Sequence, residues 1–435
     1  MSQSPILFPV ILSLVSLIAC GGSSDSAPTI TSQPSSATTV VGRPVTFEAS
    51  AKGTPAPDLV WQKNGVAISS QTDTSYTIAY PKVADAGNYT LYASNTQGNA
   101  TSDIATLTVL PVPTLDRPFG LVADSAGDLY VSDASRHTIS KLTHNTDGTF
   151  SQSLLAGSDG IVGSADGTGS AATFNTPESL ALDGSGNLYV ADYDNHTIRK
   201  VTANGTVSTV AGSVGQSGSA DGIGTAATFK HPMGLAFDAT YTFLYVADSE
   251  NHTIRRIKMD TLAVSTFAGT PGSSGSTDGS AGLFSSPNGL TVDSSGNLYV
   301  ADYGNSTIRK VTSAGVVSTL AGTAGVTGTA NGTGGSGHFY QPVGITLDAS
   351  GNLLVADTFN HAIRKVTTAG VVTTLAGYRG VYGNEDDTGS DAYFNRPSNI
   401  WVQDGIAYVT DYRNGLIRTI TSAGVVGTIT SPIEE

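Results

Sequence analysis

Short runs of alternating apolar and polar residues extend along most of the chain, and clusters of Gly, Asn, Asp and Ser separate them. A period of two places successive side chains on opposite faces, which is typical of half-buried β-strands. The 51 glycines favour tight turns, and charged residues make up only 13%, too few for coiled coils or long solvated helices. The pattern therefore predicts an all-β protein.

One pattern of about 55 residues recurs six times. R-P-F-G-L-V-A-D-S-A-G-D-L-Y-V-S-D at residues 117–133 returns as T-P-E-S-L-A-L-D-G-S-G-N-L-Y-V-A-D at residues 176–192, and then four more times. The repeated prolines are Pro118, Pro177, Pro232, Pro287, Pro342 and Pro397. Each copy holds four strand-like runs, which in the second copy are residues 180–182, 188–191, 197–201 and 207–211. Four antiparallel strands repeated six times predict a six-bladed β-propeller.

The units P-x-G-L-A-x-D, G-N-L-Y-V-A-D and N-H-T-I-R-K-V closely resemble NHL repeats, over residues 117–431. The resemblance implies a propeller of the NHL type. A phenylalanine precedes the proline by three residues in the last five copies, and Leu115 takes this place before Pro118. We expect these side chains to plug the core. Since the first repeat opens on its inner strand and the last ends on its outer one, each blade should be complete and the ring should close by packing between blades.

The region before the repeats shows the strand and turn spacing of a β-sandwich. G-T-P-A-P-D-L-V-W-Q-K-N-G at residues 53–65, followed by D-A-G-N-Y at residues 85–89, resembles the I-type immunoglobulin fold. The resemblance implies that Trp61 is the core tryptophan and that Tyr89 forms a tyrosine corner. The family's two cysteines fall at Ala49 and Leu91, so its disulfide is absent. This domain is either a passive spacer or an adhesive module.

The N-terminus carries an apolar, proline-broken stretch that ends at Cys20, the single cysteine of the chain. Its length suits a signal peptide and is short for a membrane span. L-I-A-C at residues 17–20 resembles the lipobox of bacterial lipoproteins, which implies cleavage before Cys20 and lipidation of its thiol. The alternative is an ordinary signal cleavage site that happens to lie beside a cysteine. Gly21 after the cysteine favours the outer membrane or the cell surface.

These patterns divide the chain into five expected segments. They are a signal peptide with a lipobox at residues 1–19, a lipidated cysteine and flexible tether at 20–28, an immunoglobulin-like domain at 29–110, a linker at 111–116 and the six-bladed propeller at 117–431.

Several residues with chemically reactive or charged side chains recur, each at its own fixed position in the repeat. In the second copy these are Asp183 and Asp192 at the ends of the first two strands, His196, and Arg199. A catalytic pair or a metal centre requires one special cluster, whereas these groups recur in blade after blade. We expect the acids to bind local backbone N–H groups, the histidines to make contacts between blades and the arginines to pair with the acids. No catalytic residue, metal ligand or cofactor is predicted.

Two positions differ from copy to copy, and both are expected on one face of the propeller. One follows the repeated proline, and the other lies in the loop after the V-A-D motif. A face with several aromatic rings and mixed charges suits binding, because aromatic rings supply contact area at a low entropy cost. The alternative is that these aromatics are scattered surface residues. The candidate binding residues are Tyr193, Asp194, Glu250, Tyr303, Phe359, Tyr412, Arg413, Glu178, Met233 and Asn288.

The charge balance narrows the expected partners. With 35 acidic and 21 basic residues the net charge is −14, whereas nucleic-acid binding needs a basic face. We expect an exported, lipid-anchored protein of the bacterial cell envelope that binds a protein, peptide or glycan outside the cytoplasm. The alternative is a lyase-like or hydrolase-like enzyme with a site in the central channel, since some six-bladed relatives such as streptogramin lyase carry out chemistry there.

Overall fold

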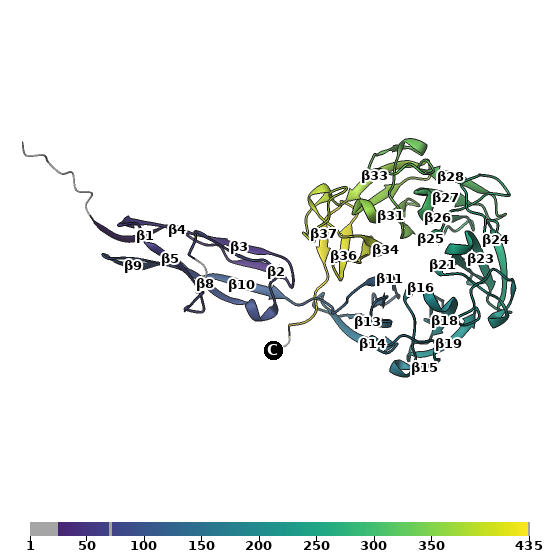
Figure 1. Ribbon diagram of the computed structural model, residues 1–435, viewed down its shortest axis with the longest axis horizontal. Coiled ribbons are helices and arrows are strands. Elements are labelled where there is room, and N and C mark those ends of the chain that lie inside the picture. Colours follow the sequence, from purple (N-terminus) through teal and green to yellow (C-terminus); the bar gives the residue numbers. More distant parts are fainter. Residues whose placement is uncertain (1–24, 69–71, 434–435) are drawn as a thin grey trace, which may run out of the picture. The chain divides into compact units, whose positions relative to one another are not determined.

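The computed structural model describes residues 25–68 and 72–433, which divide into two compact units with the boundary between Val109 and Leu110 (Figure 1). Cys20 and the expected signal peptide lie outside the described residues. Apart from single-turn 3₁₀ helices, every described element is a β-strand, which confirms the all-β class. The described part holds no helix that is both long and apolar enough to cross a membrane.

The N-terminal unit is an immunoglobulin-like sandwich. Its strands are β1 (Ser26–Ser32), β2 (Ala37–Val40), β3 (Val45–Glu48), β4 (Ser50–Thr54), β5 (Asp58–Lys63), β6 (Val66–Ala67), β7 (Ser75–Ile78), β8 (Gly87–Asn95), β9 (Gly98–Thr101) and β10 (Ala105–Leu110), with a 3₁₀ turn η1 (Val83–Asp85) before β8. The largest sheet has the order β2-β10-β8-β5-β6, with β9 paired to β8, while β1 pairs with β4 and β3 with β7.

The core of this unit contains the residues that the family resemblance implied. Trp61 is fully buried, and its indole N–H donates a 3.0 Å hydrogen bond to the Asp73 carbonyl oxygen. The Tyr89 hydroxyl donates to the Asp85 carbonyl oxygen at 2.8 Å, which confirms the tyrosine corner. Ala49 and Leu91, at the two positions of the missing disulfide, are both buried in the same apolar cluster. Apolar packing therefore fills the place of the cross-link.

The C-terminal unit consists of six sheets with four consecutive antiparallel strands each, some with a short extra strand. The strands are β11 (Pro118–Ala123), β12 (Leu129–Asp133), β13 (Thr138–His144) and β14 (Phe150–Ala156) in blade 1; β16 (Pro177–Leu182), β17 (Leu188–Asp192), β18 (Thr197–Val201) and β19 (Thr206–Ala211) in blade 2; β21 (Pro232–Phe237), β22 (Phe243–Asp248), β23 (Thr253–Lys258) and β24 (Ala263–Ala268) in blade 3; β25 (Pro287–Val292), β26 (Leu298–Asp302), β27 (Thr307–Val311) and β28 (Val317–Ala321) in blade 4; β30 (Ile345–Leu347), β31 (Leu353–Asp357), β32 (Ala362–Val366) and β33 (Val371–Ala376) in blade 5; and β34 (Pro397–Gln403), β35 (Ile406–Asp411), β36 (Leu416–Thr421) and β37 (Val426–Thr428) in blade 6. The predicted propeller is confirmed.

Short elements in the loops between blades complete the unit. Two-residue strands β15 (Gly167–Thr168), β20 (Gly222–Ile223) and β29 (Gly332–Thr333) pair with the outermost strands of blades 2, 3 and 5. The 3₁₀ turns are η2 (Gly169–Ala171), η3 (Tyr193–Asn195), η4 (Gly224–Ala226), η5 (Ser249–Asn251), η6 (Tyr303–Asn305), η7 (Gly334–Ser336), η8 (Thr358–Asn360) and η9 (Gly389–Asp391).

The first strand of each blade lies innermost, and neighbouring inner strands contact one another around the ring seen in Figure 1. The third residue of the P-x-G motif allows this close approach. An added Cβ on Gly234 would lie 2.2 Å from the Asn288 carbonyl oxygen, and one on Gly289 would lie 2.3 Å from that of Val343. Gly289 N–H in fact donates to the Val343 carbonyl oxygen of the next blade at 2.9 Å. The inner strands are therefore drawn together at this level of the channel.

The ring closes as expected, between blades 6 and 1 and without a strand borrowed from the other end of the chain. β11 contacts β34, and the Thr410 hydroxyl donates to the Phe119 carbonyl oxygen at 2.8 Å. The segment after β37 adds contacts that the sequence did not suggest. Ile429 is buried in the apolar cluster of blade 1, and the Phe150 N–H donates to the Thr430 carbonyl oxygen at 2.8 Å. Side-chain packing and a few hydrogen bonds thus hold the two ends of the ring together.

Candidate functional site

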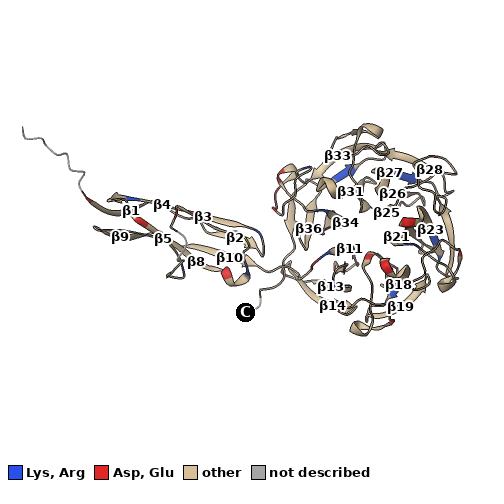
Figure 2. Ribbon diagram, viewed as in Figure 1, with Lys and Arg blue, Asp and Glu red and all other residues tan. Residues whose placement is uncertain are grey.

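Blades 2 to 6 share a buried ion pair that joins the second strand, the third strand and the preceding inter-blade loop. In blade 2 the Arg199 guanidinium donates to Asp192 Oδ2 at 2.7 Å and to Asp166 Oδ1 at 2.7 Å, and its carbon lies 5.3 Å from the centre of the Phe174 ring. Burial raises the pKa of Asp192 to about 6 despite the hydrogen bonds from Asn195, from a backbone N–H and from Arg199. The matching arginines are Arg255, Arg309, Arg364 and Arg418, all fully buried. Basic positions recur on these third strands in Figure 2.

The predicted roles of the repeated residues are confirmed. The ring nitrogen Nδ1 of His196 accepts the His231 backbone N–H from the next blade at 3.2 Å, and His137, His252 and His361 accept in the same way. At the hairpin between the first two strands, Asp183 Oδ1 accepts the Ser185 and Asn187 N–H groups at 2.9 Å. The phenylalanines at the predicted plug position are fully buried beneath the arginines. These residues hold the fold together.

The variable positions instead meet at one mouth of the channel. A pocket of about 360 Å³ lies where the inner strands begin and the second strands end. Seven of the ten candidate residues line it: Tyr193, Met233, Glu250, Asn288, Tyr303, Phe359 and Tyr412. They come from blades 2 to 6 but occupy only two places in the repeat, the residue after the proline and the loop after V-A-D. We call this cavity the aromatic pocket.

Hydrogen-bonded turns carry several of these side chains. In blade 2 the turn η3 follows Asp192 directly, and the Asn195 side chain donates to Asp192 Oδ2 at 2.8 Å and to the Gly163 carbonyl oxygen at 2.7 Å. The turn ends at His196 in the left-handed conformation, with φ of 59°. The same arrangement recurs at η5, η6 and η8. The repeat therefore fixes the backbone while the residue at the pocket is free to differ.

Three candidate residues do not line the pocket. Glu178 is buried in the layer of residues that follow the prolines, with an exposed fraction of 8%. Asp194 points instead to its neighbours, where its carboxylate accepts the Thr176 hydroxyl at 2.6 Å and lies 3.5 Å from His231 Nε2. The Arg413 guanidinium carbon lies 5.8 Å from the centre of the ring of Tyr412, which itself lines the pocket. Sequence position alone did not separate these residues from those that reach the cavity.

Several lining residues were missed, and Arg396 is the most informative of them. It precedes the repeated proline, at a position that also varies between copies, and its guanidinium carbon lies 4.5 Å from the centre of the Phe359 ring. Among the described residues no carboxylate forms an ion pair with it. The variation before the proline was a usable signal. Ser286 precedes its proline in the same way. Phe119, Val343 and Ser398 follow the proline and Ser249 and Thr358 follow V-A-D, so these five lie at the predicted positions although they are not among the ten candidates.

Charge is distributed unevenly around the pocket. On the side of blades 2 and 3, His231 lies between two acids, with Nδ1 3.1 Å from Glu250 Oε2, and its ring stacks on Tyr193 at 4.3 Å. Burial opposes ionisation of Glu250, but hydrogen bonds from His231 and Lys230 hold its pKa below the usual value. The side of blades 5 and 6 carries the unpaired Arg396. Burial raises the pKa of Tyr193 and of Tyr303, so both hydroxyls stay neutral donors.

The residue after the proline of blade 2, Glu178, carries an unusual carboxyl group. Burial, and next the nearby charge of Asp194, raise the pKa of Glu178 to about 8. Its Oε2 atom has no hydrogen-bond partner among the described residues. The side chain is therefore protonated at neutral pH, because an unpaired charge in such surroundings is too costly.

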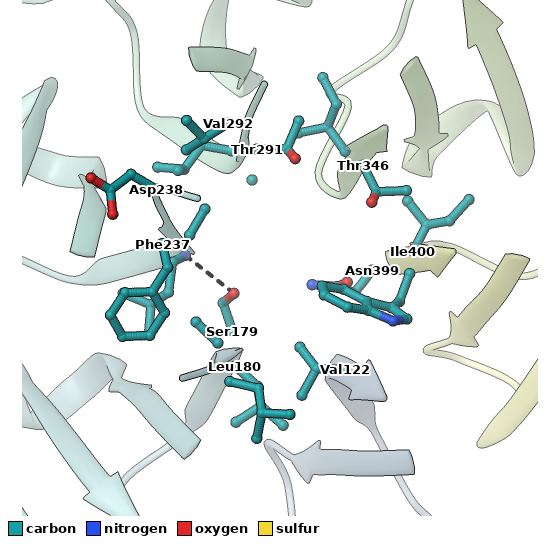
Figure 3. A pocket seen from close by; sticks show the side chains of 18 of the residues that line it. Val122, Ser179, Leu180, Phe237, Asp238, Thr291, Val292, Thr346, Asn399 and Ile400 are labelled. Atoms are coloured by element: carbon teal, nitrogen blue, oxygen red, sulfur yellow. Dashed lines mark hydrogen bonds between the residues drawn. The ribbon is translucent and has the colours of Figure 1, made fainter. Parts of the chain in front are cut away.

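The other end of the channel has a different chemistry. A cavity of about 360 Å³ lies between the later residues of the inner strands, and Figure 3 shows Val122, Leu180, Val292 and Ile400 around it. The dashed line in that view is the 3.3 Å hydrogen bond from the Leu235 N–H to the Ser179 hydroxyl. Most residues around this mouth are aliphatic, and its charged residues are the acids Asp238 and Asp293, whereas the aromatic pocket carries one acid, Glu250, and one base, Arg396. In the described part of the chain no group of three or more His, Cys, Asp or Glu side chains could hold a metal ion.

Comparisons with known families agree with this architecture. A model of the immunoglobulin domain matches residues 27–95, one of the teneurin NHL domain matches residues 163–336, and one of the NHL repeat matches residues 339–366. The chain contains an immunoglobulin domain and NHL repeats. Its repeats are similar to NHL repeat-containing protein 2 of Bos taurus, with 31% identity over 297 residues, 59% of this chain and 40% of the relative. The human protein of that name is 29% identical over 351 residues, 72% of this chain and 47% of the relative. This chain thus spans less than half the length of these two relatives.

Solved structures resemble both units together. A protein of unknown function from Bacteroides thetaiotaomicron aligns with a TM-score of 0.55 and 16% identity, over 93% of this chain and 98% of that chain. An auxiliary nutrient binding protein from Bacteroides ovatus aligns with a TM-score of 0.53 and 13% identity, over 93% of this chain and 98% of that chain. At such identities the likeness shows the fold alone.

Proposed function

We propose that this protein is an exported, lipid-anchored binding protein whose propeller takes a segment of a protein, peptide or glycan into the aromatic pocket. The observation that carries the proposal is the meeting of variable residues from different blades in one cavity. The repeated residues of the same blades are engaged in structural contacts, whereas the residues at the pocket are not fixed by the repeat. A site made of the positions at which the repeats differ is suited to recognition.

The chemistry of the pocket supports this proposal. Five aromatic rings line it, from Phe119, Tyr193, Tyr303, Phe359 and Tyr412. Aromatic rings present flat apolar surface to sugar rings and to peptide side chains, and the neutral tyrosine hydroxyls add hydrogen bonds. Glu250 and Arg396, on different sides of the pocket, provide polar contacts that select orientation. Its volume of about 360 Å³ accommodates a short segment, at the lower end of typical ligand pockets.

The test is to measure binding to synthetic peptide and glycan arrays before and after the aromatic surface is removed. The test variant combines Tyr193→Ala, Tyr303→Ala, Phe359→Ala and Tyr412→Ala. We expect this variant to lose the binding that the wild-type protein shows. An array signal that survives all four substitutions would refute the assignment of the pocket.

A matched control removes exposed aromatic rings elsewhere. Tyr80 of the immunoglobulin-like unit is 79% exposed and Tyr382 of the propeller is 69% exposed, and neither lines the pocket. The variant Tyr80→Ala with Tyr382→Ala should bind as the wild type does. Hydrogen exchange of the inner strands, measured on both variants, verifies that the ring remains folded.

The proposed anchor is Cys20, on the strength of the L-I-A-C motif that precedes it. Two or more acyl chains would give stable attachment to a membrane, because each buried methylene contributes about 0.8 kcal/mol. Metabolic labelling with a palmitate analogue in a bacterial host, followed by fractionation, tests this. We expect the label in the wild type and its loss in Cys20→Ala. An unlabelled wild-type protein would leave the binding proposal intact and remove the anchor.

A further inference from the structure

Blade 1 departs from the other five blades at the positions that build the buried ion pair. Ser140 of β13 faces Val131 across the sheet, as Arg199 of β18 faces Val190 in blade 2. Leu115 takes the place of the phenylalanine beneath the arginine. Blade 1 also follows directly on the N-terminal unit, so it lacks the preceding inter-blade loop that supplies Asp166 to blade 2.

A cavity lies where the arginine is missing. It has a volume of about 300 Å³ and is lined by Thr114, Asp133, Arg136, Thr138, Ser140, Gln152, Ser153, Leu154 and Asp159. The carboxylate of Asp133, which corresponds to Asp192 of blade 2, is fully buried at this cavity. It accepts backbone N–H groups, including that of Asp116 at 2.7 Å, but no described cationic side chain forms an ion pair with it. We call this cavity the blade-1 vacancy.

The local charge is one cation short of the arrangement in the other blades. Three carboxylates, those of Asp116, Asp133 and Asp159, raise the pKa of Arg136 together, with the hydrogen bond to Asp159 as the largest cause. Arg136 is already held by Asp159, with Nε–Oδ1 at 2.9 Å and Nη2–Oδ2 at 2.6 Å. In blade 2, by contrast, Arg199 contacts both Asp192 and Asp166. The side chains around the vacancy therefore carry a net negative charge, which a second cation would offset.

Part of the missing hydrogen bonding is taken over by Gln152. Its Nε2 donates to the Thr114 carbonyl oxygen at 3.1 Å and to the Ser140 hydroxyl at 3.2 Å. The Arg199 guanidinium donates to the equivalent Thr173 carbonyl oxygen at 3.2 Å. Gln152 is an exposed side chain, however, and it carries no charge. It satisfies the carbonyl but leaves the carboxylate without its cation.

The outer edge of blade 1 is also less covered than the edges of the other blades. The outermost strands of blades 2, 3 and 5 pair with β15, β20 and β29, and those of blades 4 and 6 form isolated bridges to Gly279 and Thr388. β14 is an edge strand, and within the described residues its outer side receives only the single hydrogen bond to Thr430. An unpaired edge offers backbone N–H and C=O groups to an extended segment.

We propose that the blade-1 vacancy binds the guanidinium group of an arginine side chain, carried on an extended segment of another protein that lies along β14. Blades 2 to 6 each hold such a guanidinium at this position, which shows what the repeat is shaped to accept. The undescribed residues 1–24, 69–71 and 434–435 cannot supply this group, because they contain no Lys or Arg. The site is separate from the aromatic pocket and shares no lining residue with it.

Arginine is favoured over lysine by geometry. In blade 2 the two terminal nitrogens of Arg199 act separately, Nη1 on Asp192 and the Thr173 carbonyl oxygen, and Nη2 on Asp166 and the Ala165 carbonyl oxygen. A planar guanidinium presents this fork of donors, whereas an ammonium group is a single point of charge. The vacancy retains the counterparts of the first two acceptors, Asp133 and the Thr114 carbonyl oxygen, and the latter already accepts from Gln152.

The experiment uses three blocked tripeptides, acetyl-Gly-X-Gly-amide with X as arginine, citrulline or lysine, titrated against the full-length protein by saturation-transfer difference NMR. We expect the arginine peptide to bind at least about tenfold more tightly than the citrulline peptide, which keeps the shape but lacks the charge, since one charge-assisted pair is worth about 1.4 kcal/mol or more. The lysine peptide should bind more weakly than the arginine peptide. Equal binding of all three, or of arginine and lysine, would overturn the proposal and indicate general attraction to an acidic protein.

A pair of variants locates the binding. The double variant Ser140→Arg, Gln152→Val gives blade 1 the residues that blade 2 has at these positions, Arg199 and Val207. Gln152 is equivalent to Val207, because Gln152 pairs with Leu142 in blade 1 as Val207 pairs with Val201 in blade 2. This variant should fill the vacancy from within and abolish binding of the arginine peptide. Ser140→Ala leaves the vacancy open and should retain binding, as should the fourfold variant of the aromatic pocket. Undiminished binding to a folded Ser140→Arg, Gln152→Val protein would refute the site, and the peptide comparison on the wild type decides the question if that variant does not fold.

Discussion

Glu178 offers the sharpest test of the electrostatics at the channel. It stands after Pro177 at the start of β16, is only 8% exposed, and has an oxygen without a hydrogen-bond partner in the described structure. Burial raises its pKa from 4.5 to about 8, so the folded protein retains a proton that the unfolded chain releases. The substitution Glu178→Gln keeps the shape and removes the titration.

The expected size follows from proton linkage. As the pH rises above 4.5, the unfolded state is favoured by ionisation while the folded state stays protonated up to about pH 8. At about 1.36 kcal/mol per pH unit, wild-type stability is lowered by about 3 kcal/mol at pH 7 and by less than about 1 kcal/mol at pH 5. Glu178→Gln should therefore be more stable than the wild type by about 3 kcal/mol at pH 7 and nearly equal to it at pH 5.

The assay is urea unfolding at pH 5 and pH 7, read by pulsed hydrogen exchange and mass spectrometry on peptides from β16 and β21, so that only the propeller contributes. Glu250→Gln serves as the contrast. Burial raises the pKa of Glu250, but His231 and Lys230 lower it by a larger amount, so the net pKa lies below 4.5. The carboxylate therefore adds stability above pH 4.5, and this stability is lost as the pH falls. That variant should lose stability at pH 7. A Glu178→Gln protein whose advantage does not grow between pH 5 and pH 7 would refute the reasoning.

Three further predictions concern the fold. Arg255→Met leaves the fully buried Asp248 carboxylate unpaired and should destabilise the propeller by about 3–5 kcal/mol in urea unfolding; a loss below about 1 kcal/mol would contradict this. Tyr89→Phe removes the hydrogen bond to Asp85 and should cost the immunoglobulin-like unit about 1 kcal/mol, measured by hydrogen exchange of β8. Ile429→Ala opens the closure of the ring and should lower stability by about 2–4 kcal/mol, with faster exchange in β14 first; uniform change across all blades would argue against a local role.

The repeat made most of the propeller predictable. Because each copy carries the same turn residues and the same alternation, the strands of the second copy could be bounded to within a few residues, and the roles of His196 and Arg199 followed from their recurrence. In the N-terminal unit, Trp61 and Tyr89 lie where the family resemblance implied. Periodic features are predictable because each copy has the same turn residues and strand pattern and therefore adopts the same local structure.

The aromatic pocket was predictable only in part. The two variable positions led to seven lining residues, but they also led to Glu178, which does not line the pocket although the equally buried Met233 and Asn288 at the same repeat position do. Whether the residue after a proline reaches the cavity depends on how closely neighbouring inner strands approach. That distance is set by glycine contacts between blades, such as Gly289 with Val343, which lie 54 residues apart in the chain.

Blade 1 differs from the other five blades at the position of the buried arginine. In its own surroundings Ser140 is an ordinary polar residue. Its significance appears only when it is compared with Arg199 and the arginines at the same position in blades 3 to 6. Five blades show that the surrounding backbone suits a buried guanidinium, and in each of them this group pairs with a fully buried carboxylate. Blade 1 keeps the carboxylate of Asp133 while giving up the arginine. Removing one partner of a buried ion pair is costly. Blade 1 nevertheless retains both the acid and an open cavity beside it. A cation supplied by another molecule explains this arrangement better than simple loss of the pair does.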